Sequence, residues 1–165
     1  PPVVGGTALL FTLGRRGLVG QWLDNWFNFS LPFTTAGSVV AASFVAMPFY
    51  VIAVEGALRT NSQELEELAS TLGAKPATVL RRITLPRLRP AIGAGLALAW
   101  ARALGEFGAT VTFAGNLPGR TQTLPLATFL ALETDPEAAL VLSLIMLVLS
   151  LIILLSLRDY WVLKR

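Results

Sequence analysis

Three long apolar segments, separated by polar ones, dominate the pattern of hydrophobic and polar positions along the chain. They cover residues 36–58, 90–113 and 138–157. An α-helix needs about 20 apolar residues to cross a bilayer, so each segment is long enough. A fourth apolar stretch, residues 1–13, is too short to cross alone. We therefore expect an all-α, polytopic membrane helix bundle with three full spans and one partial span. Because the chain begins with Pro and not Met, we expect one transmembrane domain over residues 1–165 whose earlier spans are missing.

The segment between the first two spans, residues 59–89, is polar and predicts two short helices joined by a turn. Asn61 and Glu64 are spaced as in a capping box, which opens the first helix. The apolar positions then recur at helical spacing and form one stripe: Leu65, Leu68, Ala69 and Leu72. Gly73 is expected to end this helix, because glycine adopts the left-handed conformation at little cost.

Pro76 suits the first turn of a second short helix. We expect this helix to run from Ala77 to about Arg82 and to end at Leu85-Pro86. Both helices are too short and too polar to span a bilayer. Residues 59–89 therefore form an amphipathic helix-turn-helix, called the elbow below.

The elbow resembles the EAA loop of ABC-importer permeases. The family pattern is E-A-A, three residues, G, nine residues, then I-x-L-P. This chain has Glu67-Leu68-Ala69, three residues, Gly73, nine residues, then Ile83-Thr84-Leu85-Pro86, and it departs from the pattern only at Leu68. The resemblance implies a type I ABC-importer permease fold whose cytoplasmic coupling loop docks into a cleft on an ATP-hydrolysing subunit. The residues implied for docking are Glu67, Leu68, Ala69, Leu72, Gly73, Lys75, Ile83, Leu85 and Pro86.

A helix lying on the lipid surface is the alternative for the first half of the elbow. Such helices usually carry Lys and Arg on their polar face. This one carries three glutamates, Glu64, Glu66 and Glu67. The charge therefore favours docking to a protein.

The composition is typical of a membrane protein and argues against several classes of function. Of 165 residues, 54% are hydrophobic and 14% are charged, against about 25% charged residues in a typical soluble domain. The net charge of +3 does not indicate a nucleic-acid partner, because the positive residues flank apolar spans. The sequence has no Cys and no His, which argues against disulfides, thiolate chemistry and a metal site. We expect membrane lipid around the spans.

Lys and Arg residues predict the orientation, because they concentrate in cytoplasmic loops. Nine of them lie in the elbow or after the last span: Arg59, Lys75, Arg81, Arg82, Arg87, Arg89, Arg158, Lys164 and Arg165. Three lie on the opposite side: Arg15, Arg16 and Arg120. We therefore expect the elbow and the C-terminus in the cytoplasm, and the loops at 17–35 and 114–137 outside.

Arg102 and Glu106 are the charged residues inside the second predicted span. Their spacing of four places them on one face of a helix. Charges at this depth are costly, so we expect pairing or a water-filled cavity. One interpretation is a lining or gate of a translocation path, and the other is an ion pair that fixes helix packing.

The stretch from 101 to 126 resembles the permease subunit of molybdate transporters. R-A-L-G-E-F-G at 102–108 and G-N at 115–116 are shared with the related sulfate permeases, whereas G-R-T-Q-T-L-P at 119–125 is similar to the molybdate branch. The resemblance implies an importer of molybdate or tungstate in the inner (plasma) membrane of a prokaryote. Its partners would be a second permease copy that completes the pore as a homodimer, two ATP-binding subunits and an extracytoplasmic oxyanion-binding protein.

The same resemblance assigns expected roles to two further groups of residues. The candidates for the pore and its gate are Arg102, Glu106, Thr110 and Thr112. The candidates for the outer loop are Asn116, Arg120 and Gln122. No cofactor is expected on this chain, since the sequence has no G-x-x-x-x-G-K-[ST] loop to hold a nucleotide. ATP and Mg²⁺ would be bound by the partner.

Other functions stay open at this point. Sulfate or thiosulfate is the nearest alternative cargo. A structural or inactive membrane subunit is an alternative of another class, because the chain lacks the expected first spans. A membrane enzyme would need a nucleophile with its base, or metal ligands; without His and Cys neither is present, and Arg102 with Glu106 is the only start of a site. We therefore expect a transport subunit and not an enzyme.

Overall fold

The computed structural model describes residues 1–60 and 64–162, and these residues form helices and connecting loops with no strand. The all-α prediction is confirmed for this part of the chain. The elements are α1 (Pro2–Leu13), α2 (Gly20–Phe27), α3 (Thr35–Thr60), α4 (Glu64–Thr71), α5 (Pro76–Val79), the π-helical turn η1 (Leu80–Thr84), α6 (Leu85–Leu104), α7 (Gly108–Phe113), α8 (Leu124–Thr134) and α9 (Pro136–Val162). Asn61, the expected cap of α4, lies outside the described residues.

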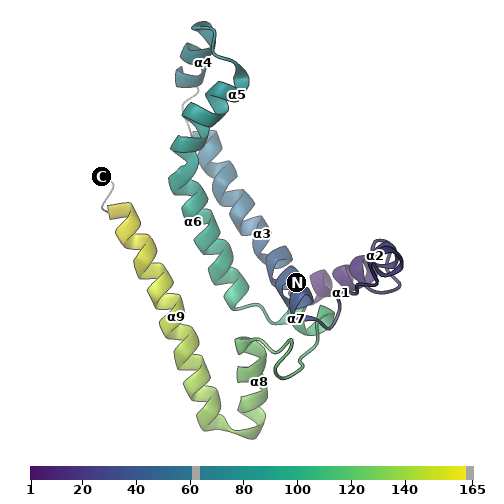
Figure 1. Cartoon of the computed structure of the whole chain (residues 1–165). Helices are drawn as coiled ribbons and strands as arrows, with labels where there is room; N and C mark the ends of the chain where they lie inside the picture. The colour runs from purple at the N-terminus through teal and green to yellow at the C-terminus, as the bar shows by residue number, and fades with distance from the viewer. Residues whose placement is uncertain (61–63, 163–165) are drawn as a thin grey trace.

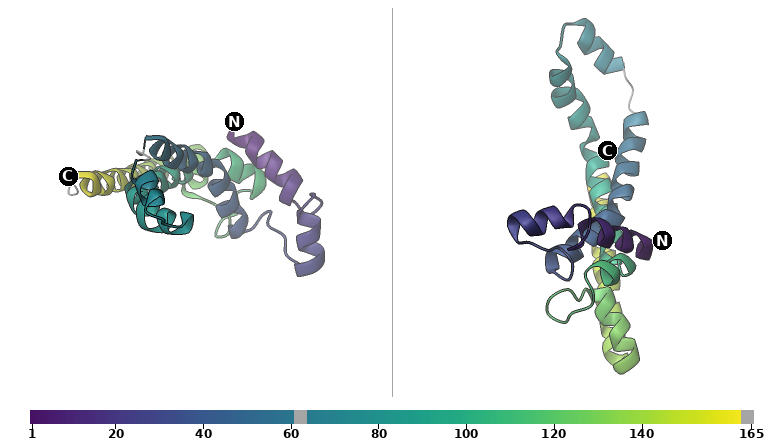
Figure 2. Two further views of the ribbon diagram at one scale, coloured as in Figure 1. Left: turned by 90° about the horizontal axis from the view of Figure 1, so that it is seen from above. Right: turned by 90° about the vertical axis from the view of Figure 1, so that its right-hand side faces the viewer.

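Two antiparallel helices, α3 and α6, form the centre of the molecule (Figure 1). Small residues let their backbones approach closely. A Cβ atom added at Gly95 of α6 would lie 3.1 Å from the ring of Tyr50 and 3.3 Å from Ala53 on α3. The elbow, residues 59–89, includes α4, α5 and η1, and it extends from one end of this pair. α1, α2 and α7 lie near the other end (Figures 1 and 2).

Two helices in the described part of the chain are long and apolar enough to cross a membrane, Thr35–Thr60 and Pro136–Leu155. They match the first and third predicted spans. α9 is largely uncovered by the rest of the chain, and its leucines, such as Leu147 at 61% exposed, face outward. A helix that is apolar all round suits lipid or a neighbouring membrane helix. α9 runs back toward the elbow end (Figure 1).

The second predicted span, residues 90–113, is wrong as a single helix. α6 already begins at Leu85 and ends at Leu104, and the separate helix α7 begins at Gly108. Phe107 leaves the helical region, with φ −124° and ψ −57°. The glycines on either side weaken the helix here. The side chain of Glu106 accepts the backbone N–H of Ala109 at 2.8 Å and so supports the new helix start. α6 alone is about 30 Å long.

The predicted helix end at Leu85-Pro86 is also wrong, because α5, η1 and α6 follow one another without a break. The backbone N–H of Leu85 bonds to the carbonyl of Leu80, five residues back. A proline ring normally collides with the carbonyl four residues earlier. The wider π turn directly ahead of Pro86 relieves that collision, so α5, η1 and α6 form one continuous helical rod.

The buried core lies where α1, α3 and α7 meet. It contains Leu9, Ala41, Ala109 and Phe113, with Phe113 fully buried. A Cβ atom added at Gly6 of α1 would lie 2.8 Å from the carbonyl oxygen of Ala109, which explains the close approach of α1 and α7. The segments at 17–35 and 114–137, both expected as loops, contain the helices α2 and α8.

Candidate functional site

The turn of the elbow depends on a glycine in the left-handed conformation. Gly73 has φ +84°, and nothing lies within 4 Å of an added Cβ. The N–H of Gly73 bonds to the carbonyl of Ser70, and the N–H of Ala74 bonds to the carbonyl of Ala69, each at 3.0 Å. This pair of bonds is the Schellman arrangement that ends many helices. Backbone conformation, and not crowding, therefore requires glycine here.

The second half of the elbow begins as the sequence predicts. Lys75 is the N-cap residue, with extended backbone at φ −68° and ψ 147°, and Pro76 follows in the first helical position. The proline has no N–H to leave unsatisfied there. Farther along the rod, Leu85 is exposed, whereas Ile83 and Pro86 are half-buried.

The apolar stripe of α4 faces away from the rest of the chain. Leu65, Leu68 and Leu72 are 48%, 58% and 87% exposed. Ala69 is half-buried and Glu67 is exposed. Leucine side chains gain about 1.5–3 kcal/mol each when they are fully removed from water. The stripe is thus a surface whose burial would require another molecule.

A hydrogen bond that the sequence analysis missed joins the two halves of the elbow. The hydroxyl of Thr84 donates to Oε1 of Glu66 at 2.7 Å. Thr84 is 7% exposed and lies at the variable position of the I-x-L-P pattern. The sequence pattern places Glu66 only on the polar surface of the first elbow helix, because no one-dimensional pattern pairs residues 18 positions apart. The bond ties α4 to the rod formed by α5, η1 and α6.

The second candidate group lies at the junction between α6 and α7. Nη1 of Arg102, in the last turn of α6, is 2.7 Å from Oε2 of Glu106. Their side chains are 25% and 1% exposed. The other carboxylate oxygen accepts the N–H of Ala109. The guanidinium carbon of Arg102 also lies 5.9 Å from the ring centroid of Phe49 on α3. One glutamate thus connects the end of α6 to the start of α7.

The two candidate threonines of α7 differ from each other. The hydroxyl of Thr112 donates to the carbonyl of Gly108 at 2.7 Å, within its own helix. Thr110 is fully buried, and its hydroxyl has no hydrogen-bond partner in the described part of the chain. A buried hydroxyl without a partner is uncommon and marks Thr110 as the more notable of the two. Whether either residue lines a pore stays a prediction.

The loop between α7 and α8, residues 114–123, is called the outer loop after its expected position, and it is organised around Thr121, for which no role was predicted. Its hydroxyl accepts the N–H of Leu117 at 2.9 Å, and it is 2% exposed. Two hydroxyls at the start of α3 hold the loop: Thr35 donates to the carbonyl of Arg120 at 2.8 Å, and Ser38 donates to that of Thr121 at 3.4 Å. These bonds span more than 80 positions in sequence, so no local pattern could have indicated them.

The three outer-loop candidates lie in different environments. Arg120 is exposed, Gln122 is half-buried, and Oδ1 of Asn116 is buried without a hydrogen-bond partner in the described residues. The structure therefore distributes the predicted residues over three places: the elbow, the junction of α6 and α7, and the outer loop. The last two are adjacent along the chain, whereas the elbow is at the far end of the α3 and α6 pair (Figure 1).

Comparison with known proteins gives consistent results. Residues 1–165 match the family described as "Binding-protein-dependent transport system inner membrane component". The Molybdenum transport system permease protein ModB of Mycobacterium tuberculosis is 51% identical over 156 residues, which cover 94% of this chain and 59% of that protein. The protein of the same name from Haemophilus influenzae is 44% identical over 167 residues, which cover 100% of this chain and 72% of that protein.

A relative whose name gives a different cargo is also similar. The Sulfate transport system permease protein CysT of Salmonella typhimurium is 38% identical over 160 residues, covering 96% of this chain and 57% of that protein. The chain thus spans less than two thirds of the length of most of these relatives. Their names describe transport permease subunits, in agreement with the expectation that this chain is not an enzyme. The match over its whole length, together with the helical membrane fold, shows that the chain belongs to the family of inner membrane components of binding-protein-dependent transport systems, which have the type I ABC-importer permease fold.

Proposed function

We propose that the protein to which this chain belongs is the transmembrane permease of an ATP-driven importer of molybdate or tungstate. The exposed leucine stripe of α4 is the observation that carries the coupling role. It lies on a projection beyond the α3 and α6 pair, where a cytoplasmic subunit can reach it (Figure 1). The 51% identity to a molybdenum transport permease supports the cargo.

In this proposal the stripe docks onto an ATP-hydrolysing subunit. The subunit binds ATP and Mg²⁺, and this chain binds no cofactor. Movement of the docked elbow is transmitted along the continuous rod of α5, η1 and α6 to Arg102 and Glu106 at its far end. Two copies of the permease enclose the pore, and an extracytoplasmic binding protein delivers the oxyanion to the loop that contains Asn116, Arg120 and Gln122.

The charge distribution supports the proposed orientation, with the elbow and the C-terminus in the cytoplasm of a prokaryotic cell. The elbow contains six Lys and Arg residues: Arg59, Lys75, Arg81, Arg82, Arg87 and Arg89. Arg15, Arg16 and Arg120 line one pocket at the other end of α3. This asymmetry follows the rule that cytoplasmic loops carry more Lys and Arg.

Sulfate is the second candidate cargo, and the 38% identity to a sulfate permease is the observation that favours it. Molybdate, tungstate and sulfate are all tetrahedral dianions. The two cargo classes are therefore best separated by direct titration.

The test is oxyanion-stimulated ATPase activity of the full-length permease, reconstituted with its ATPase and binding protein. Molybdate, tungstate and sulfate are titrated separately. Stimulation by molybdate and tungstate, without sulfate, is expected. Stimulation by sulfate alone would support an ATP-driven importer whose cargo is sulfate. An intact complex that responds to none of the three anions would overturn the proposed function.

A further inference from the structure

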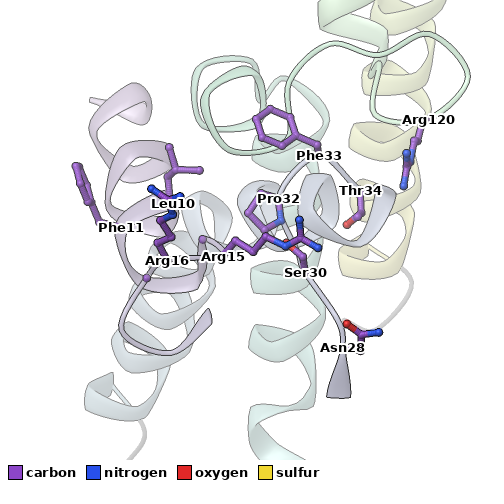
Figure 3. Close-up of a pocket in the computed structure, with 12 residues that line it drawn as sticks. Leu10, Phe11, Arg15, Arg16, Asn28, Ser30, Pro32, Phe33, Thr34 and Arg120 are labelled. Atoms are coloured by element: carbon purple, nitrogen blue, oxygen red, sulfur yellow. The ribbon is translucent and has the colours of Figure 1, made fainter. Parts of the chain in front are cut away.

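An open pocket of about 850 Å³ lies between the end of α1, the segment that leads into α3, and the outer loop. Three arginines line it, Arg15, Arg16 and Arg120. Figure 3 shows that Arg15 and Arg120 extend toward Thr34 from two sides, whereas Arg16 lies beside Leu10. The pocket therefore brings together the three arginines of the outer side, which are up to 105 positions apart in the sequence.

The positive charge in this pocket is only partly balanced. Nε of Arg15 lies 3.4 Å from Oδ2 of Asp24, and the Arg15 side chain is 73% exposed. An exposed ion pair of this kind is weak. Arg16 and Arg120 have no carboxylate partner in the described part of the chain. No Asp or Glu is among the residues that line the pocket.

Further hydrogen-bond donors accompany the arginines. The side chains of Ser30 and Asn28 line the pocket, and neither is used in a hydrogen bond within the described residues. Thr34 is different, because its hydroxyl already donates to the carbonyl of Leu31 at 2.6 Å. Guanidinium groups present paired N–H donors that match the oxygens of an oxyanion. A concave wall of low polarity concentrates the field of such charges.

We propose that this pocket binds a tetrahedral oxyanion at the outer face of the permease, with Arg15 and Arg120 as the principal ligands and Arg16 as a further positive charge. The pocket is much larger than one such anion, so the anion is held with part of its water shell. That the bound anion is also the cargo, captured here on its way inward, rests on the proposed function. The apolar residues Leu10 and Phe33 also line the pocket, so a lipid phosphate offers the same chemistry as a dissolved anion.

The test measures equilibrium binding of radiolabelled molybdate and tungstate to the full-length permease in complex with its ATPase, without ATP and without the binding protein. The double variant Arg15→Gln, Arg120→Gln should weaken the binding at least about tenfold, because it removes two charge-assisted hydrogen-bond donors from the anion. The variant Arg15→Lys, Arg120→Lys should lose less, because it keeps the charge. Binding to the native complex should weaken as salt is raised.

A matched control removes the same charge from the other end of the molecule. Arg81 and Arg89 are exposed and lie on the elbow side. The double variant Arg81→Gln, Arg89→Gln should bind the anions as the native complex does. Thermal unfolding of all variants checks that they are folded, which is expected because the substituted arginines are exposed.

Two arms distinguish the sources of the oxyanion. Binding of molybdate that persists in phospholipid nanodiscs identifies a dissolved anion. Binding in detergent that is lost in nanodiscs identifies the lipid phosphate as the occupant.

Equal binding by the native and the Arg15→Gln, Arg120→Gln complexes would overturn the site, even if oxyanions still stimulate the ATPase. If binding depends on these arginines but the ATPase of the complex responds to no oxyanion, the site is supported and the proposed function is rejected.

Discussion

The elbow and the junction between α6 and α7 use their side chains in opposite ways. In the elbow, the leucines of α4 face outward, and Leu72 is 87% exposed. At the junction, Glu106 and Thr110 are buried, at 2% and 0% exposed, and Phe113 is fully covered. One continuous rod, from α5 through η1 to α6, connects the two regions (Figure 1).

This contrast indicates what each region needs in order to be stable. At the junction, Glu106 finds its partners within the chain, because it pairs with Arg102 and accepts the N–H of Ala109 at the start of α7. The elbow keeps its shape through backbone bonds at Gly73 and through the bond between Glu66 and Thr84. The leucines of α4 are 48% to 87% exposed, so they contribute little to the fold of the chain. A change at the junction should therefore act on stability, and a change on the elbow surface should act on coupling.

Gly73→Pro should have the largest effect. Proline is restricted to φ near −65°, whereas Gly73 has φ +84°. The turn between α4 and α5 would be lost, and oxyanion-stimulated ATPase activity and uptake should fall to background while the protein stays in the membrane. Gly73→Ala is the matched control, because an added Cβ meets nothing within 4 Å and only the left-handed conformation costs about 1–2 kcal/mol. Unchanged uptake in the proline variant would refute the coupling role.

Glu106→Ala should be the most harmful change at the junction. It removes the partner of Arg102 and the acceptor for the N–H of Ala109. Loss of one partner of a buried ion pair costs about 3–5 kcal/mol, and the partial exposure of Arg102 places this case toward the lower end. The readouts are the amount in the membrane and the apparent Tm in detergent. Glu106→Gln keeps an acceptor for the N–H of Ala109, so its membrane level and its Tm should lie between those of the native protein and of the alanine variant. A native level and a native Tm for the alanine variant would show that the pair does not hold the junction.

Thr84→Val should loosen the elbow by about 1 kcal/mol, the typical contribution of one hydrogen bond. The bond to Glu66 is lost, whereas the shape of the side chain is nearly kept. Hydrogen exchange should become faster in α4 and stay unchanged in α6. Thr78→Val, at an exposed position of α5, is the control. If hydrogen exchange in α4 were equal in the two variants, the Thr84 hydroxyl would not help to hold α4 against the rod.

Leu72→Ser should have the smallest effect on the fold. Exposed substitutions usually change stability by less than about 0.5 kcal/mol. Affinity for the ATPase subunit should nevertheless fall, because burial of a leucine contributes about 1.5–3 kcal/mol. Ser70→Ala, on the opposite side of α4, is the control. If Leu72→Ser left the affinity unchanged and lowered the Tm instead, the stripe would belong to the fold and not to a docking surface.

The features that the sequence predicted correctly depend on local chemistry. The apolar spans at α3 and α9 follow from composition, and the turn at Gly73 follows from the one residue type that accepts φ +84° at little cost. The break between α6 and α7 was missed because residues 90–113 read as one apolar run. The decisive contact there, from Glu106 to the N–H of Ala109, competes with an ordinary helical bond and has no hydrophobic signal.

Span length, turn chemistry and motif spacing are properties of neighbouring residues, so they predict a helical membrane component with an elbow of the permease type without any knowledge of the fold. Three further arrangements became visible only in the folded chain: Thr84 donates to Glu66, Thr121 anchors the outer loop to α3, and Arg15 and Arg120 share a pocket. These arrangements join residues that are far apart along the chain. Their geometry follows from how the helices pack, and no local pattern contains it.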